Sequence, residues 1–318
     1  MTQSRALPYL TLIFGVFIAA TSSILIRLAQ AGGEGAPSMV IASWRLVFAV
    51  LVLTPIAWRR RSHELRHLPR RDLSWGILAG LLLGAHLTAW ISSLAYTSVA
   101  SSAALVTTNP LWVAIATYFL FGEKPTRNTM MGLIVGFTGS VLIAFSDGGI
   151  LMFDSSGLQL NWGNLTTPAG QADTALYGDF LALIGAIAVS GYLLVGRTLR
   201  PRISNTAYVW LAYTAAMAAT VMVTWLSGYS LLGYSHETYF WMLLLALGPQ
   251  LLGHTIFNWS LAHLSATFVA LAILGEPIGS AILAYFIFGE TFAPLQLVGF
   301  VLLLVGIGLG VSGEQRSE

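Results

Sequence analysis

The chain has 318 residues, of which 56% are hydrophobic and 9% are charged, and its formal net charge is +2. Soluble domains carry roughly 25% charged residues, so this composition excludes an ordinary soluble protein and indicates an integral membrane protein. The sequence contains no cysteine, which excludes disulfides, thiolate catalysis and thiolate metal sites.

Apolar runs of about 20 residues follow one another along the chain, and this is the length that a helix needs to cross roughly 30 Å of hydrocarbon. Because unpaired backbone groups are costly in lipid, and the runs lack the alternation of a barrel, we expect helices. The predicted spans cover residues 9–29, 38–58, 73–94, 100–121, 128–146, 177–196, 205–226, 238–258, 266–288 and 294–312. The sequence therefore predicts an all-α protein with ten transmembrane helices.

The basic residues lie in alternate joints between these spans. The joint 59–72 holds six arginines, and further Lys and Arg residues lie in joints 122–127 and 197–204. The intervening joints contain no Lys or Arg. By the positive-inside rule, we expect both termini to be cytoplasmic in a protein of the cytoplasmic membrane. The slight basic excess is then a topology signal and gives no reason to expect a nucleic-acid partner.

The longest joint, residues 147–176, is rich in Gly, Ser, Thr, Asn and Asp. This composition is typical of a linker, and the topology places it on the outer face. We therefore predict two five-helix halves, residues 1–146 and 177–318, joined by this linker.

A nearly identical stretch occurs in both halves, TYFLFGE at 117–123 and AYFIFGE at 284–290. A shift of 167 residues aligns residues 93–139 with 260–306 without a gap, and fifteen of the 47 pairs are identical. Such a match indicates an internal repeat. Because each half has an odd number of spans, the second half enters the membrane from the opposite side, as in many secondary transporters. The sequence thus predicts two inverted five-helix repeats around a central cavity that opens alternately to the two sides.

These features together resemble the EamA-type permeases of the drug/metabolite transporter superfamily. The ten spans, the duplication and the YFxFGE ending on the fourth helix of each half carry the resemblance. It implies a central cavity lined by the inner helices, and an amino acid, metabolite or drug-like substrate that is often exported. We expect no cofactor and no metal, and a monomer or homodimer in the lipid bilayer. The linker 147–176 is longer than the family's usual joint.

A polar residue followed by proline occurs at corresponding positions of the two halves, Asn109-Pro110 and Glu276-Pro277. Glu276 lies about ten residues into its span, roughly 15 Å deep. Proline removes an intrahelical hydrogen bond, and paired helix breaks point to a transporter's binding site. We expect Pro110 and Pro277 to act in gating, and Asn109 and Glu276 to bind substrate. Glu276 either binds a substrate ammonium or carries a coupled proton; the alternative is a protonated or ion-paired group that only joins helices.

Arg45 lies about seven residues inside the outer end of the second span, too deep to snorkel easily. It either contacts a carboxylate of the substrate or pairs structurally with Glu276 or a carbonyl group.

Two further polar pairs, His86 with Trp90 and His254 with Asn258, lie in the third and eighth spans. Residues four apart share one face of a helix, so we expect these four to line the cavity and contact substrate. The alternative is that the histidines form hydrogen bonds between helices.

Two rival functions remain open. His67 and Asp72 match an H-x4-D spacing similar to that of lipid acyltransferases, which would make the chain a membrane-embedded enzyme, but no catalytic domain adjoins them. A passive facilitator or uniporter would have nearly the same sequence as a coupled carrier. We favour a secondary transporter, not an enzyme, that exports an amino acid or related metabolite with proton coupling through Glu276.

Overall fold

The computed structural model describes residues 6–31, 35–93, 96, 102, 105–147, 150–154, 157–160, 172–289 and 292–314. The helices of the first half are α1 (Leu7–Ala31), α2 (Ser38–Arg66), α3 (Arg70–Ser93), α5 (Asn109–Phe121) and α6 (Arg127–Asp147). A hairpin of β1 (Leu151–Asp154) and β2 (Gly157–Leu160) follows. The second half contains α8 (Ala172–Leu199), α9 (Asn205–Leu226), α10 (His236–Leu245), the π-helix η1 (Ala246–His254), α11 (Thr255–Ser260), α12 (Ala266–Ile273), α13 (Glu276–Phe288) and α14 (Pro294–Glu314).

The described residues form a predominantly helical protein of the predicted membrane class. Eight of the described helical segments are long and apolar enough to cross a membrane, and α5 is a shorter apolar helix. The count of ten transmembrane helices and the cytoplasmic location of the termini stay predictions.

The chain divides into two compact units that both draw on the two halves of the sequence. Unit 1 comprises Met1–Thr88 and Gly191–Val269, and unit 2 comprises Ala89–Ser190 and Ala270–Glu318. Helices α3, α8 and α12 each pass from one unit to the other.

The helix boundaries repeat with the shift that the sequence match gave. The bounds of α5 and α13, and those of α6 and α14, differ by 167 residues at both ends, and α2 and α9 begin 167 residues apart. Helices α5 and α13 both end at a glycine with a φ of 70°, Gly122 and Gly289. This left-handed backbone conformation is accessible to glycine without a steric penalty and stops a helix. The internal repeat is thus visible in the structure as well as in the sequence.

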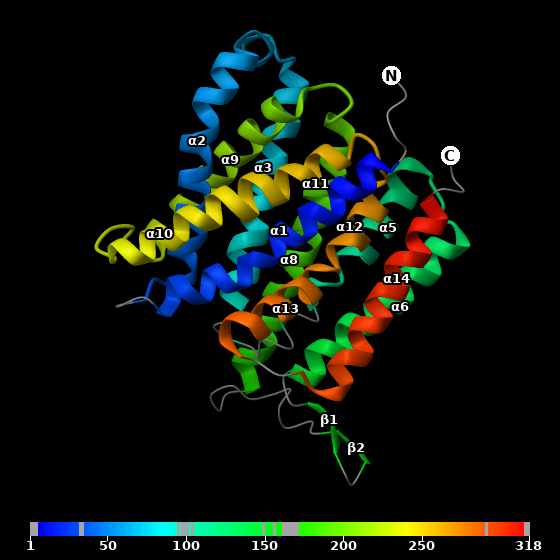
Figure 1. The fold of residues 1–318 in the computed structure, drawn as a ribbon. Coiled ribbons are helices and arrows are strands. Elements are labelled where there is room, and N and C mark those ends of the chain that lie inside the picture. The colour runs from blue at the N-terminus through cyan, green and yellow to red at the C-terminus, as the bar shows by residue number, and fades with distance from the viewer. Residues whose placement is uncertain are drawn as a thin grey trace. The chain divides into compact units, whose positions relative to one another are not determined.

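In unit 1, the repeat counterparts α2 and α9 pack against each other in opposite directions. Ser43 near the start of α2 shares a 2.9 Å hydrogen bond with Thr224 near the end of α9. Thr54, further along α2, accepts a 3.0 Å hydrogen bond from Trp210 near the start of α9. Helix α1 packs beside α10, η1 and α11, as the blue and yellow ribbons in Figure 1 show.

In unit 2, the repeat counterparts α6 and α14 pack against each other in an antiparallel arrangement (Figure 1). Glycines lie where the two helices approach each other. A Cβ on Gly132 would lie 2.6 Å from the carbonyl oxygen of Gly306, and a Cβ on Gly139 would lie 2.7 Å from that of Gly299. Gly299 is the repeat counterpart of Gly132, and Gly306 is that of Gly139. These contacts are reciprocal, as they are when a local pseudo-two-fold axis relates two helices. Small residues allow such close approach of helix backbones in lipid.

The predicted linker 147–176 is not wholly irregular. Strands β1 and β2 pair antiparallel, with Leu151 opposite Leu160, and α8 already begins at Ala172. The sequence did not predict these four-residue strands, because the composition of this joint is rich in turn-forming residues.

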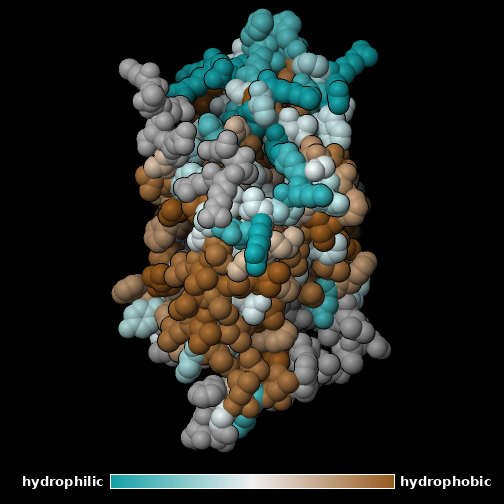
Figure 2. Space-filling view, turned by 90° about the vertical axis from the view of Figure 1, so that its right-hand side faces the viewer, coloured by the Kyte–Doolittle hydropathy of each residue, from teal (hydrophilic) through white to brown (hydrophobic). Residues whose placement is uncertain are grey.

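The surface carries many large apolar side chains. Phe119 on α5 and its repeat counterpart Phe286 on α13 are each 78% exposed. Figure 2 shows a broad, continuous surface of brown, hydrophobic residues. A soluble protein rarely exposes such a surface, whereas lipid solvates it.

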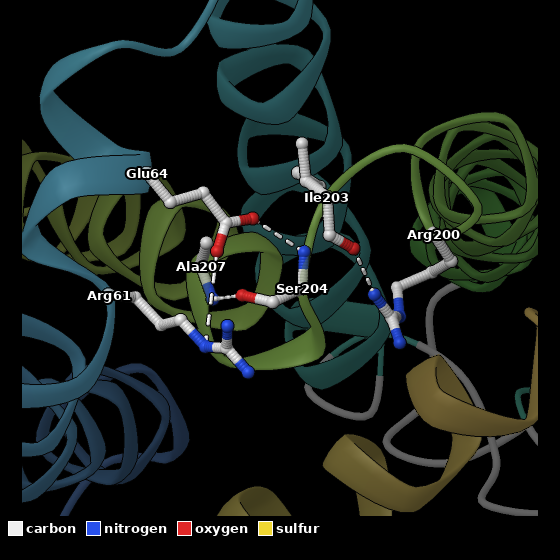
Figure 3. Close-up of polar contacts among 6 residues, drawn as sticks. All are labelled: Arg61, Glu64, Arg200, Ile203, Ser204 and Ala207. Atoms are coloured by element: carbon white, nitrogen blue, oxygen red, sulfur yellow. Dashed lines mark hydrogen bonds and ion pairs between the residues drawn. The ribbon is translucent and has the colours of Figure 1, made fainter.

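Beyond its apolar part, α2 continues to Arg66 and contacts the start of α9. The helix is interrupted at Arg61, whose φ is −138°. Glu64 accepts a 2.6 Å hydrogen bond from the backbone N–H of Ser204, the N-cap residue of α9. Ser204 in turn accepts a hydrogen bond from the N–H of Ala207 through its own side chain. Figure 3 shows both contacts, with Arg61 beside the Glu64 carboxylate.

Candidate functional site

The predicted site residues divide between the two units. Arg45, His86, His254 and Asn258 belong to unit 1, whereas Trp90, Asn109, Pro110, Glu276 and Pro277 belong to unit 2. The two sets are therefore described separately, and substrate contact by any of them stays a prediction.

In unit 1, Arg45 is 3% exposed and lies in a buried polar cluster between α1, α2, α9 and η1. Its Nε donates a 2.5 Å hydrogen bond to Oε1 of Gln250 on η1, and a guanidinium nitrogen donates a 3.4 Å bond to Ser22 on α1. The acceptors of Arg45 thus include an amide oxygen and a hydroxyl group. We call Arg45, Ser22, Gln250, Tyr213 and His254 the Arg45 cluster.

Gln250, like Ser22 and Tyr213, is a residue of this cluster that the sequence analysis did not name as a site residue. It lies within the nine-residue π-helix η1, directly after Pro249. Proline has no backbone N–H, and the widened turn of a π-helix is frequently found at functional sites. The backbone carbonyl of Gln250 accepts a 3.0 Å hydrogen bond from the hydroxyl of Tyr213 on α9. The signal that could have found it is a polar residue beside a proline, although here the proline comes first, unlike in Asn109-Pro110 and Glu276-Pro277.

His254 is the last residue of η1 and lies within electrostatic range of both Arg45 and His86. His86 on α3 is 9% exposed. Two histidines from different helices and Arg45 thus share one buried region of unit 1. Trp90, one turn after His86, is half-buried on the part of α3 that belongs to unit 2.

Asn258 lies in a separate network. It is fully buried, and its side-chain oxygen accepts a 2.8 Å hydrogen bond from the hydroxyl of Tyr192. Its backbone carbonyl accepts a 2.9 Å bond from Arg200 at the end of α8, and Arg200 also donates to the carbonyl of Ile203 (Figure 3). Burial lowers the pKa of the Arg200 guanidinium, and the negative charge of Glu64 opposes this shift. These hydrogen bonds thus connect Asn258 on α11 with Tyr192 and Arg200, not with the residues of the Arg45 cluster.

In unit 2, both predicted helix breaks coincide with the start of a helix. Helix α12 ends at Ile273 and α13 begins at Glu276, with Pro277 in its first turn. Helix α5 begins at Asn109, with Pro110 in its first turn. A proline fits the first turn because the N–H it lacks has no intrahelical partner there. The prolines therefore lie just after an interruption, not at a kink within a continuous helix.

Glu276 lies at the N-terminal end of α13, where the helix dipole stabilises a carboxylate. Its repeat counterpart Asn109 is 6% exposed, and the backbone carbonyl of Asn109 accepts a 3.0 Å hydrogen bond from Ser190 on α8. Leu274, which lies in the break between α12 and α13, packs into a core with Leu133, Leu271 and Leu303. The break is thus anchored on α6 and α14.

His67 and Asp72, the residues of the enzyme alternative, have separate contacts. The ring Nδ1 of His67 lies 2.8 Å from the carbonyl of His63, and Asp72 lies 3.5 Å from Arg202. These contacts give the side chains of His67 and Asp72 a local structural role.

The lipid-compatible surface, the repeated helix boundaries and the antiparallel counterparts define a multi-pass membrane protein built from an internal repeat. A model of the EamA-like transporter family matches residues 6–145 and 176–311. The chain belongs to this family, which confirms the predicted membership in the drug/metabolite transporter superfamily. It is a membrane transporter, so its partners are a small-molecule substrate and the lipid bilayer of the cell membrane.

Similar proteins support the class without fixing a substrate. Proteins named uncharacterized transporter from Archaeoglobus fulgidus and Clostridium kluyveri are each 20% identical, over 93% and 98% of this chain and 93% and 94% of their own lengths. A riboflavin transporter from Rhizobium johnstonii is 31% identical over 115 residues, 35% of this chain and 37% of its own. A protein of known crystal structure superposes with a TM-score of 0.77 at 16% identity, covering 99% of this chain and 100% of its own, and shares the fold.

Proposed function

We propose that this protein is a secondary transporter that moves an amino acid or related small metabolite outward across the cytoplasmic membrane by alternating access. The observation that carries the proposal is the antiparallel packing of repeat counterparts in both units, α2 with α9 and α6 with α14. Counterparts related in this way belong to halves of inverted topology. Two such halves can exchange conformations, so that a shared site opens first to one side and then to the other.

A counterflow experiment tests this function. The purified chain is reconstituted into liposomes loaded with one member of a solute panel, and uptake of the same labelled solute from outside is measured. The panel contains the common amino acids and riboflavin, which is included because a relative of partial coverage is named a riboflavin transporter. An alternating-access carrier accelerates uptake when the solute is present on the far side. Simple conductance without acceleration would instead identify a channel.

Proton coupling through Glu276 is a separate part of the proposal. The carboxylate at the start of α13, next to the helix break, is a group that can take up and release a proton during the cycle. The variant Glu276→Gln keeps the size of the side chain and removes this titration. We expect it to abolish the pH-dependent component of counterflow or of net uptake. If the pH profile of the variant matched that of the wild type, Glu276 would have no part in coupling.

A further inference from the structure

The amide of Gln250 is held in one orientation inside unit 1. The side chain is fully buried, and its Oε1 accepts the hydrogen bond from Nε of Arg45. A guanidinium can only donate, so the oxygen of the amide must face Arg45 and the nitrogen must point away from it. Among the described residues, Nε2 of Gln250 has no hydrogen-bond acceptor. The result is a buried N–H donor with a fixed direction, beside a cation.

Packing alone does not explain a residue of this kind. A buried donor that lacks an acceptor costs about 1–3 kcal/mol. The 167-residue shift places Leu83 opposite Gln250, and Ala212 opposite Arg45, in the repeat. The same fold therefore accommodates apolar residues at the corresponding positions, so the polar pair is a property of one half only.

The elements around Arg45 supply hydrogen-bond donors and basic groups. Helices α1, α9 and η1 contain no Asp or Glu. The guanidinium donates hydrogen bonds to the neutral side chains of Ser22 and Gln250, and His254 lies within its electrostatic range. Tyr213 directs its hydroxyl to the backbone of Gln250 and so positions η1. A negatively charged acceptor is the ligand chemistry that complements this combination.

We propose that Arg45 and Gln250 bind the carboxylate of the transported substrate, with Nε2 of Gln250 donating to one carboxylate oxygen and the guanidinium of Arg45 supplying the charge. Gln250 is then the residue that selects an acid over the corresponding neutral amide. This inference rests on the proposed function and specifies the substrate class of that transporter.

The test compares acids with amides of the same skeleton. The full chain is purified in lipid nanodiscs, and the ligand-induced change in melting temperature is measured for L-alanine and L-alaninamide, N-acetylglycine and N-acetylglycinamide, and benzoate and benzamide. We expect the wild type to bind at least one acid about tenfold more tightly than its amide, because a hydrogen bond to a charged group is worth that factor or more. If no acid bound more tightly than its amide, the proposal would be wrong.

Two variants assign the preference to Gln250. Gln250→Glu keeps an acceptor for Arg45 and removes the Nε2 donor, so the unliganded protein should melt no lower than the wild type while affinity for the acid falls at least about tenfold. Gln250→Met keeps the length of the side chain and should lose the acid preference as well. The control Gln159→Met, in strand β2, should bind as the wild type does. Acid binding unchanged in both Gln250 variants would overturn the assignment.

Counterflow with the same solutes separates this inference from the proposed function. If neutral solutes are exchanged and acids are not preferred, the transporter function stands and the carboxylate site fails. If acids bind in a Gln250-dependent way and no solute is exchanged, the site stands and the alternating-access function fails.

Discussion

At the scale of single residues, some polar side chains make a defined contact that stabilises the start of a helix. Glu64 is such a residue: it accepts the N–H of Ser204, which begins α9, and its carboxylate also lies 3.9 Å from Arg61. The first N–H groups of a helix have no intrahelical partner, so an acceptor supplied by another helix, here α2, satisfies one of them. The ion pair with Arg61 is half-exposed, and exposed pairs contribute little to stability.

We therefore expect Glu64→Ala to lower the free energy of unfolding by about 1 kcal/mol, because the hydrogen bond to Ser204 is lost. Arg61→Ala should change it by clearly less, since only the exposed ion pair is removed. Thermal unfolding of both purified variants in detergent measures the difference. A larger loss for Arg61→Ala than for Glu64→Ala would show that the ion pair, and not the helix start, is the stabilising contact.

Polar residues of the candidate site could be predicted from the sequence only where they carried a charge or where the repeat pointed to them. Arg45 and Glu276 were marked because charges are costly in a membrane span, and the structure places Arg45 in a buried cluster. Gln250 carries no charge, and its repeat position holds a leucine, so neither signal applied. The pairing of His254 with Asn258 assumed a regular α-helix. The structure has a π-helix that ends at His254 and a short α-helix, α11, that carries Asn258, whose side-chain oxygen accepts a hydrogen bond from Tyr192.

At the scale of helices, the repeat was the most informative sequence signal. Identical residues concentrated in residues 93–139 and 260–306, and the helices there share their boundaries with the same shift. The hairpin β1–β2 was not foreseen, because its strands are four residues long and adjoin glycines and serines. The packing of α6 on α14 depends on which glycines face each other, and this requires the three-dimensional arrangement.

Because of this packing, adding one methyl group should have different effects at two glycines of α14. A Cβ on Gly306 would lie 2.7 Å from the backbone nitrogen of Gly136 and 2.8 Å from the carbonyl oxygen of Gly132, and backbone atoms cannot rotate away. A Cβ on Gly308 would meet nothing within 4 Å. We expect Gly306→Ala to destabilise the protein by about 1–3 kcal/mol through overpacking. Gly308→Ala, which is also helical, should be neutral or slightly stabilising.

Size-exclusion chromatography and melting temperature of the two glycine variants measure this prediction. Equal behaviour of Gly306→Ala and Gly308→Ala would mean that α6 and α14 do not approach each other closely in the membrane.

At the scale of the whole molecule, the direction of each repeat through the bilayer is the property on which the proposed transport cycle depends. The reciprocal contacts of Gly132 with Gly306 and of Gly139 with Gly299 relate two counterpart helices by a local two-fold axis, and α2 and α9 are antiparallel as well. A two-fold axis that relates antiparallel helices exchanges their two ends. If both helices of such a pair cross the membrane, the equivalent ends of the two repeats must lie on opposite sides.

Because the sequence contains no native cysteine, single introduced cysteines can measure directly on which side of the membrane the equivalent ends of the two repeats lie. We expect Glu123→Cys to react with a membrane-impermeant thiol reagent only from the cytoplasmic side, and Glu290→Cys, at the equivalent position of the second repeat, only from the outer side. Arg60→Cys, in the arginine-rich joint, should label from the same side as Glu123→Cys, because the positive-inside rule makes that joint cytoplasmic. Labelling of positions 123 and 290 from the same side would contradict inverted topology, and alternating access between two inverted halves would then lose its structural basis.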